Sequence, residues 1–244
     1  MRIYHHTKFE NLEKIVTPNG LSFRGSYYKE FCDADYERTQ RVTSRIIERI
    51  CKKRNVNYDK DTSFKPIIIS FGIDADSDYM WVKYAHQYSG IQLILDYDII
   101  TKVSYDNLDY FGKCVYMRKR GRMKKFIQQK TFSVESINDI QSNLESVSAL
   151  IKPTRFKKEN EIRYIRAYSK IFEVCYEDFM LMGDKAFTDS YPTEKDDERF
   201  VYLPKETLLG IAIGYKSENK LNSVKAMLKE MNYDVSNVFI YQRE

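Results

Sequence analysis

The segment from Pro66 to Gly72, Pro-Ile-Ile-Ile-Ser-Phe-Gly, is the part of the sequence that most restricts the fold. It is apolar almost throughout and lacks the alternation of a strand that has one face in water. A short, continuous apolar run of this kind is typical of a strand that is covered on both faces. The sequence therefore predicts a β-sheet with this strand near its centre.

Other predicted strands and helices alternate along the chain on either side of this strand. Apolar runs predict strands at residues 3–7, 21–23, 91–95, 114–117, 159–166, 208–215 and 235–241, and helical spacing predicts helices at 9–17, 80–88, 133–151 and 218–232. No internal repeat or linker divides the chain. We predict a mixed α/β (α+β) fold, a single domain over residues 1–244 with a mixed central β-sheet flanked by helices.

A highly charged segment runs from Asp33 to about Asn55. Apolar residues recur in it at helical spacing, at Val42, Ile46, Ile47 and Ile50. We interpret residues 33–57 as a charged helical insertion whose charged face lies in solvent, although its isoleucine face could also meet a partner.

Several classes of protein are excluded by composition. No apolar run approaches the ~20 residues that a membrane helix needs, so we expect no membrane partner. The first predicted strand leaves no room for a signal peptide, and the four cysteines are far apart, which is typical of free thiols in the cytoplasm. Three histidines and no metal-ligand spacing make a metal centre unexpected.

Two carboxylates, Glu159 and Glu161, stand two residues apart at the start of the strand predicted before Arg166. Residues two apart in a strand face the same side, so we expect both to project together with Arg163 beyond them. Such close like charges raise each other's pKa unless solvent, arginines or a functional site relieves them. The residues alone favour a solvated strand edge that is paired with basic neighbours, because surface ion pairs are common.

A basic segment from Arg118 to Lys125 carries six positive charges, whereas the whole chain carries a net charge of +5. Gly121 in its middle predicts a hairpin or loop tip. Most charge runs are simply solvated, but this one would attract phosphates. Its candidate nucleic-acid-binding residues are Arg118, Lys119, Arg120, Arg122, Lys124 and Lys125.

Short motifs resemble two groups of known proteins. The first strand and helix resemble those of DNA-modifying ADP-ribosyltransferase toxins in Tyr4-His5-His6-Thr7, Asn11-Leu12, Ile15 and Gly20-Leu21. The remaining motifs resemble a large uncharacterised bacterial family, domain of unknown function 2971, in Ser70-Phe71, Met80-Trp81, Tyr84-Ala85, Gly90-Ile91, Val115-Tyr116, Glu159–Arg163 and Leu203-Pro204. The family's usual Phe-Asn-Asp is replaced here by Phe31-Cys32-Asp33.

The toxin resemblance implies an ADP-ribosyltransferase-like split sheet and NAD as the substrate, with no metal. It implies that Glu161 bonds the nicotinamide ribose and that Glu159 activates the acceptor. A fixed carboxylate suits this reaction because cleavage of the glycosidic bond passes through an oxocarbenium-like state. The residues that it implies in NAD binding are His5, Thr7, Ser70, Phe71, Trp81 and Tyr84.

The residues themselves favour plainer roles for three members of that set. His5 and His6 are adjacent strand residues that face opposite sides, and a lone strand histidine is more often packed than a ligand. Trp81 has the spacing of a core residue on an amphipathic helix, whereas Tyr84 keeps a hydroxyl that could serve a pocket.

Three functional hypotheses therefore remain open. The first is an NAD-dependent ADP-ribosyltransferase, which the resemblance associates with an intracellular toxin or phage-defence effector that modifies nucleic acid or protein and meets a protein partner such as an antitoxin. The second is a catalytically silent nucleotide- or nucleic-acid-binding domain of the same fold. The third is an interaction subunit whose aromatic residues are all core. Convergence of His5, Tyr84 and Glu161 on one cleft would favour the enzyme.

Overall fold

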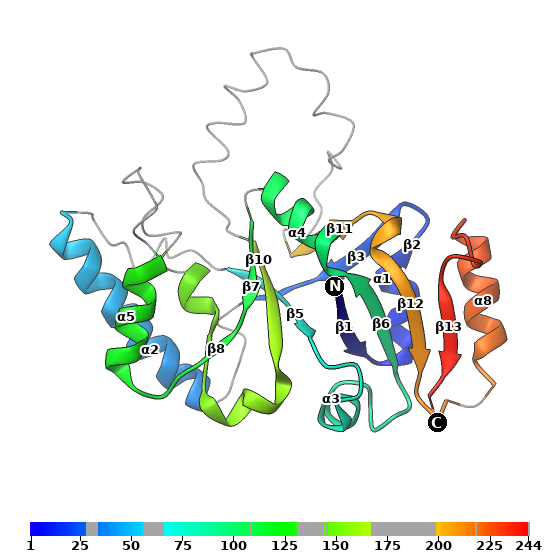
Figure 1. The fold of residues 1–244 in the computed structure, drawn as a ribbon, viewed down its shortest axis with the longest axis horizontal. Helices are drawn as coiled ribbons and strands as arrows, with labels where there is room; N and C mark the ends of the chain where they lie inside the picture. The colour runs from blue at the N-terminus through cyan, green and yellow to red at the C-terminus, as the bar shows by residue number, and fades with distance from the viewer. Residues whose placement is uncertain are drawn as a thin grey trace, which may run out of the picture.

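The computed structural model describes residues 1–27, 34–55, 66–107, 109–130, 144, 146–166, 199–217 and 219–243. Its centre is one mixed sheet in the order β13-β12-β6-β1-β5-β10-β7, and β4 also pairs with β5 (Figure 1). The strands are β1 (Arg2–Thr7), β4 (Ser26–Tyr27), β5 (Ile67–Gly72), β6 (Ile91–Asp96), β7 (Tyr110–Lys113), β10 (Glu161–Arg166), β12 (Leu208–Ile213) and β13 (Phe239–Gln242). The predicted mixed α/β class is confirmed.

Most neighbouring strands of this sheet are antiparallel, and the pair β12–β13 is parallel. Two small sheets accompany it. One has the order β11-β3-β2, and the other is a parallel pair, β8–β9. Their strands are β2 (Val16–Thr17), β3 (Gly20–Arg24), β8 (Val115–Tyr116), β9 (Ile151–Lys152) and β11 (Phe200–Leu203).

Strand β5 occupies the central position that its apolar sequence predicts. Ile67, Ile68, Ile69 and Phe71 are all buried, because layers cover both faces of the strand. One edge of β5 pairs with β10 over its whole length, from Glu161↔Gly72 to Arg166↔Ile67.

The other edge of β5 is shared by two strands. At its end β5 pairs with β1 at one position, Tyr4↔Gly72, and at its beginning it pairs with β4 through Ser26↔Ile68 and Tyr27↔Ile67. The sheet is therefore interrupted between β1 and β5 beside Ser70. The likeness of this interruption to the split of ADP-ribosyltransferases stays a prediction.

Different layers cover the two faces of the sheet. The larger core lies on the face of Ile3, Phe71 and Ile162, where the small sheet β11-β3-β2 and the helices α1 (Leu12–Ile15), α4 (Tyr97–Asp106) and α8 (Leu221–Glu230) pack. On the opposite face, α3 (Asp78–Lys83) buries Trp81 against Ala212. The segment 144–159, which includes the 3-10 helix η3 (Thr154–Glu159), covers β5 and β10 on that face.

Two further helices, α2 (Ala34–Lys53) and α5 (Arg120–Lys130), lie side by side at one end of the molecule (Figure 1). Their shared core contains Ile46, Ile50, Met123 and Ile127 together with residues of the segment 144–151. The helix expected over about 33–55 is α2. The hairpin expected at residues 118–125 is wrong, because the chain is helical from Arg120 onward.

The physical reason for the error at residues 118–125 lies in two buried side chains. Met123 and Ile127 stand four residues apart and pack on the isoleucines of α2, which stabilises a helix. Gly121 is the second residue of that helix, where a glycine has less effect than in the middle of one.

Two predicted helices have different ends in the structure. The helix expected at 80–88 stops at Lys83, because His86, Gln87 and Tyr88 have left-handed backbone angles that turn the chain into β6. Of the helix expected at 133–151, residues 144 and 146–149 are helical, Ile151 belongs to β9, and residues 131–143 and 145 lie outside the described residues.

A substitution at Gly90, which directly precedes β6, can test how closely the backbone packs at this turn. A Cβ atom there would lie 2.3 Å from the carbonyl oxygen of Thr7 and 2.8 Å from that of Ala85. Because both neighbours are backbone atoms, we expect Gly90→Ala to lower the free energy of unfolding by about 1–3 kcal/mol. Equilibrium urea denaturation at 25 °C measures the change.

Gly121 provides the matched control for this glycine substitution. Its Cβ would meet no heavy atom within 4 Å, and it lies in a helix. We expect Gly121→Ala to raise the free energy of unfolding by up to about 1 kcal/mol. Equal effects of the two substitutions would contradict the close approach at Gly90.

Candidate functional site

The candidate site is formed by the two predicted carboxylates and the chain on either side of them. Glu159 ends η3, and Glu161 begins β10. Asn160 between them has a left-handed conformation with φ of 41°, so Glu159 is not part of the strand as expected. This turn directs both carboxylates toward the side chain of Lys152 in β9.

Lys152 hydrogen-bonds to both carboxylates, to Oε2 of Glu159 and to Oε2 of Glu161. The side chains of Lys152, Glu159 and Glu161 are at most 3% exposed. The expectation of a solvated strand edge is therefore wrong. A buried charge needs a paired and hydrogen-bonded partner, and Lys152 is shared between the two.

The remaining carboxylate oxygens also have partners. Oε1 of Glu159 accepts hydrogen bonds from Nζ of Lys83 at 2.6 Å and from the hydroxyl of Tyr84 at 3.0 Å. Oε1 of Glu161 accepts from Nε of Arg163 at 2.5 Å, as the shared strand face of these two residues predicts. All four oxygens of the pair are thus hydrogen-bonded.

The cations determine the ionisation of Glu161. Burial by itself would raise the pKa of this carboxyl, but the charges of Arg163 and Lys152, together with their hydrogen bonds, outweigh burial and hold the pKa well below its usual range. Glu161 is therefore a carboxylate at neutral pH. The hydrogen bonds of Lys83 to Glu159 and Tyr79 likewise outweigh its burial and raise the pKa of Lys83.

Strand β5 contributes Ser70 to the site. Its hydroxyl donates a hydrogen bond of 2.8 Å to Oε1 of Glu161. The pairing of Ser70 with Arg163 and of Gly72 with Glu161 places these side chains on one face of the sheet. Ser70 is partly exposed, so it marks a side from which solvent reaches the site.

His5 lies on the opposite face of the sheet from Glu161. It pairs with Leu93 of β6, and its ring lies 5.0 Å from the ring of Phe23 and 5.9 Å from that of Phe71. Its Nδ1 atom is 3.1 Å from the carbonyl oxygen of Ser70, at the interruption between β1 and β5. Burial lowers the pKa of His5, although the contact with Ser70 opposes this, and the ring is neutral at pH 7.

Of the other residues implied in NAD binding, Tyr84 lies at the carboxylates, and Trp81, Phe71 and Thr7 lie elsewhere. Tyr84 joins the carboxylates through Glu159, and its side chain is partly exposed, at 38%. Trp81 is fully buried and stacks on Tyr88, as its core spacing predicts. Phe71 lies in the large core, and the hydroxyl of Thr7 accepts a hydrogen bond from the amide group of Asn11.

The structure therefore brings together the side chains of Ser70, Tyr84, Glu159 and Glu161. The side chains of Thr7, Phe71 and Trp81 lie elsewhere, and His5 contacts the carbonyl oxygen of Ser70 from the other face of the sheet. Sequence reasoning missed Lys152 and Lys83. Lys152 ends β9 and Glu159 ends η3, so the two residues lie in different elements and no single strand or helix period relates their side chains. The only sequence signal for a lysine here was the closeness of the two carboxylates, because two like charges buried together need a cation beside them.

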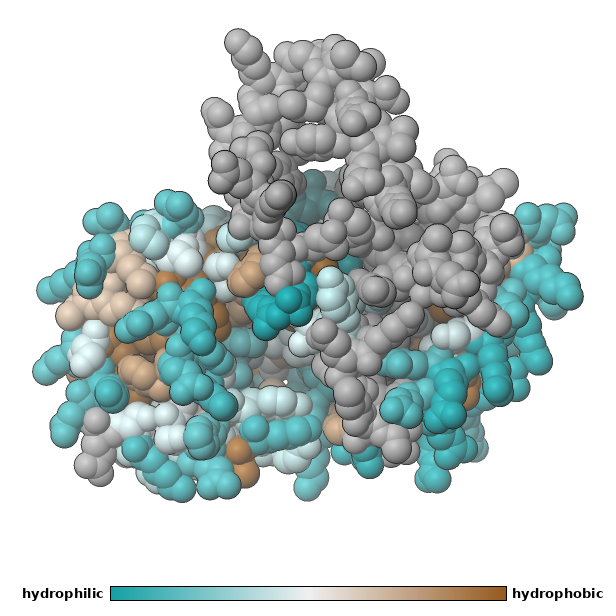
Figure 2. All heavy atoms as spheres, turned by 180° about the vertical axis from the view of Figure 1, so that it is seen from behind, coloured by the Kyte–Doolittle hydropathy of each residue, from teal (hydrophilic) through white to brown (hydrophobic). Residues whose placement is uncertain are grey.

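The basic segment supplies a second surface, away from the carboxylates. Arg120 and Lys124 of α5 line a groove against α2, whereas Arg118, Lys119, Arg122 and Lys125 are exposed outside that lining. Seen from behind, hydrophilic side chains dominate the end of the molecule that these helices form (Figure 2).

The described residues include two cysteines and were also searched for metal-ligand groups and membrane-spanning helices. Cys51 and Cys114 are buried free thiols, and burial raises the pKa of Cys114 to about 12. Cys32 and Cys175 lie outside the described residues. Among described residues, no group of three or more His, Cys, Asp or Glu side chains could hold a metal ion. None of the described helices is both long and apolar enough to span a membrane.

Comparison with known families gives a match that includes the two carboxylates. Residues 80–164 match the model of a family described as protein of unknown function (DUF2971). The match covers about a third of the chain, from α3 to β10, and contains Lys83, Lys152, Glu159 and Glu161. Comparison with curated proteins and with solved structures found no similar protein in either set.

The shared cation of this network can be tested by its effect on stability. We expect Lys152→Met to lower the free energy of unfolding at pH 7 by about 3–5 kcal/mol, because it leaves two buried carboxylates without their common partner. The loss should shrink as the pH falls from 7 toward 4. The depressed pKa of Glu161 contributes to the stability of the wild type above pH 4.5, and this contribution is lost as the pH falls. In the variant, by contrast, protonation at low pH neutralises the unpaired buried carboxylates and so reduces their cost.

Lys158→Met is the matched control for Lys152→Met. Lys158 belongs to η3 and is exposed. Its replacement should change the unfolding free energy by less than about 0.5 kcal/mol at either pH. Urea denaturation between pH 4 and pH 7 measures both variants, and a constant loss in Lys152→Met across this range would contradict the buried ion pair.

Proposed function

We propose that this protein transfers ADP-ribose from NAD, with Glu161 as the residue that stabilises the reacting ribose. The observation that carries the proposal is the position of this carboxylate. Glu161 begins β10, is held by Ser70 of the neighbouring strand, and lies beside the point where β1 and β5 separate. Glu159, the other half of the predicted pair, shares Lys152 with it.

The proposed reaction breaks the bond between the ribose C1′ atom and the nicotinamide nitrogen. The electron pair of that bond leaves with nicotinamide, which becomes neutral, and positive charge develops on the ribose. A carboxylate whose ionised form is strongly favoured suits this step, because it stabilises that charge without taking up a proton. An acceptor then forms a bond to C1′ and releases a proton.

The surrounding residues define how NAD would reach Glu161. The hydroxyl of Ser70 bonds Oε1 and is partly exposed, so a ribose hydroxyl would approach Glu161 beside Ser70. Tyr84 and Lys83 are partly exposed and lie on the side of Glu159, where an acceptor would enter. The ring of His5 lies on the face opposite Glu161. In this proposal His5 therefore acts through its contact with the backbone of Ser70.

The acceptor in this proposal is nucleic acid or protein, and the cell context is a cytoplasmic toxin or phage-defence effector of a bacterium, with an antitoxin as the expected protein partner. The resemblance of the first strand to modifying toxins supports this context.

A second candidate is a catalytically silent domain of the same fold that binds a nucleotide or nucleic acid. A specific observation favours it. All four oxygens of Glu159 and Glu161 have hydrogen-bond donors, and the two side chains are 1% and 3% exposed. Buried ion pairs of this kind also occur as parts of the fold without chemistry.

NAD labelled in the nicotinamide and in the adenine group separates these candidates. With DNA, RNA or cell lysate present, we expect release of nicotinamide and transfer of the adenine label. Glu161→Gln keeps the shape of the side chain but removes the charge that stabilises the ribose. It should lower kcat by about 100-fold or more and change KM by less than threefold, on the scale of other losses of electrostatic stabilisation.

A second pair of variants protects this test against misfolding of Glu161→Gln. Ser70→Ala removes the donor to Glu161 and should lower kcat while the near-ultraviolet circular dichroism stays native. Ser104→Ala removes a buried hydroxyl that bonds the Thr101 carbonyl oxygen in α4, and it should leave kcat unchanged. If the folded wild type shows neither nicotinamide release nor a thermal shift with NAD, the enzyme hypothesis is rejected and the silent domain is favoured.

A further inference from the structure

Positive charge in this protein is concentrated in two helices that are far apart in sequence. Helix α2 contains six Arg and Lys against three acidic residues, and α5 contains five against none. Together they hold a net charge of +8, more than the +5 of the whole chain, so the rest of the protein is net negative. The basic character is therefore a property of the pair, which lies side by side (Figure 1).

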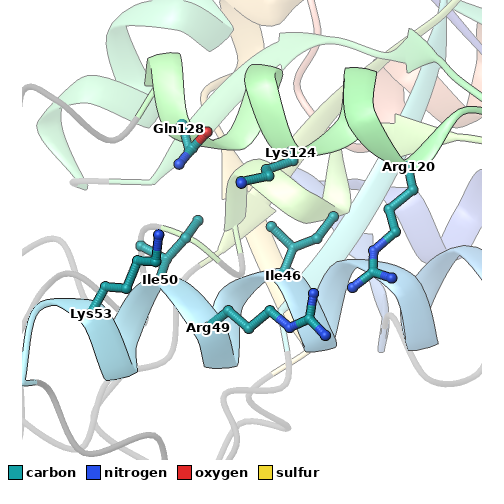
Figure 3. Close-up of a pocket in the computed structure, with 7 residues that line it drawn as sticks. All are labelled: Ile46, Arg49, Ile50, Lys53, Arg120, Lys124 and Gln128. Atoms are coloured by element: carbon teal, nitrogen blue, oxygen red, sulfur yellow. The ribbon is translucent and has the colours of Figure 1, made fainter.

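A groove runs between these two helices, and Figure 3 shows the side chains that line it. Its volume is about 210 Å³. The lining consists of two isoleucines, four cationic side chains and one amide: Ile46, Ile50, Arg49, Lys53, Arg120, Lys124 and Gln128. None of these seven residues is acidic.

The cations form one row on each helix. Arg49 and Lys53 are four residues apart on α2, and Arg120 and Lys124 are four residues apart on α5. Four residues of α-helix span about 6 Å along the axis, so each row presents two charges in succession. Figure 3 shows both rows beside the same groove.

These four cations are available to a ligand. In the described part of the chain, none of the four has a carboxylate within ion-pair distance, and all four are exposed. The acid nearest to Arg49 in sequence, Glu48, is half-buried and does not line the groove. Glu37 pairs with Arg41, which is also outside the lining. Unpaired cations in one concave place raise the local concentration of anions.

We propose that this groove binds the phosphodiester backbone of a nucleic-acid strand. A chain with one negative charge per repeat matches two successive charges on each rim. The groove is smaller than the ~300 Å³ at which enclosed small-molecule pockets begin, so it suits a chain that passes along it. None of the described residues that line it is an aromatic residue that could stack a base, so recognition does not depend on the base sequence.

A membrane surface fits the groove less well than a nucleic acid. Ile46 and Ile50 are 3% and 8% exposed and form its floor, whereas a helix that binds a lipid surface projects its apolar side chains outward. The groove extends the predicted nucleic-acid site, because it combines two residues of that site, Arg120 and Lys124, with Arg49 and Lys53 of α2. It deepens the nucleic-acid part of the proposed function and does not require NAD cleavage.

The test measures binding without NAD, so that its failure differs from failure of the transferase proposal. Fluorescence anisotropy is recorded with fluorescein-labelled 20-nucleotide strands of RNA and DNA and with a DNA duplex, from 50 to 200 mM salt. We expect wild-type binding that weakens with salt. Replacing Arg49, Lys53, Arg120 and Lys124 together by Gln should weaken binding at 50 mM salt at least tenfold. For a single strand it should also reduce the slope of log K against log salt by about 3, because each phosphate contact contributes ~0.7.

The matched control removes the same number of charges from α2 alone. Arg38, Arg41, Arg45 and Lys52 are exposed and lie outside the groove, and their joint replacement by Gln should weaken binding less than threefold. Circular dichroism checks that both variants are folded. Equal losses in the two variants, or no wild-type binding at 50 mM salt, would overturn the proposal. Displacement of the strand by polyglutamate at equal charge concentration would also overturn it, in favour of an acidic polypeptide.

Discussion

The structure around the candidate site depends on the shared contact of Lys152 with Glu159 and Glu161. This contact joins three consecutive pieces of chain, β9, η3 and β10, on one face of the central sheet. Each charge by itself would be costly to bury, and the arrangement is tolerable because every carboxylate oxygen has a donor. The same contact keeps Glu161 ionised while it is nearly excluded from solvent.

The interruption of the sheet gives this buried pair its connection to the surface. Because β1 and β4 share one edge of β5, the backbone of Ser70 has no strand partner on that edge among the described residues. Its carbonyl oxygen instead meets His5, and its hydroxyl meets Glu161. One residue of the central strand thus contacts both faces of the sheet, which is why two residues on opposite faces are coupled through it.

The two surfaces of functional interest have contrasting electrostatics. At the carboxylates, cations and anions are matched and buried, so the site is ordered before any ligand arrives. In the groove between α2 and α5, four cations are exposed and lack carboxylate partners among the described residues, so an anion would supply the missing charge. An ADP-ribosyltransferase that modifies nucleic acid would use both, and a silent binding domain would use the second.

The sequence by itself determined the central place of β5, from its continuous apolar run, and the shared face of Glu161 and Arg163, from the two-residue period of a strand. These features follow from local patterns. The tertiary structure alone decided that Lys152 meets both carboxylates, because that contact depends on the left-handed turn at Asn160. It also decided that the ring of His5 lies on the other face, because strand register fixes the face of each side chain. In the same way, burial of Met123 and Ile127 against α2 made a helix of a segment whose glycine and charges indicated a loop.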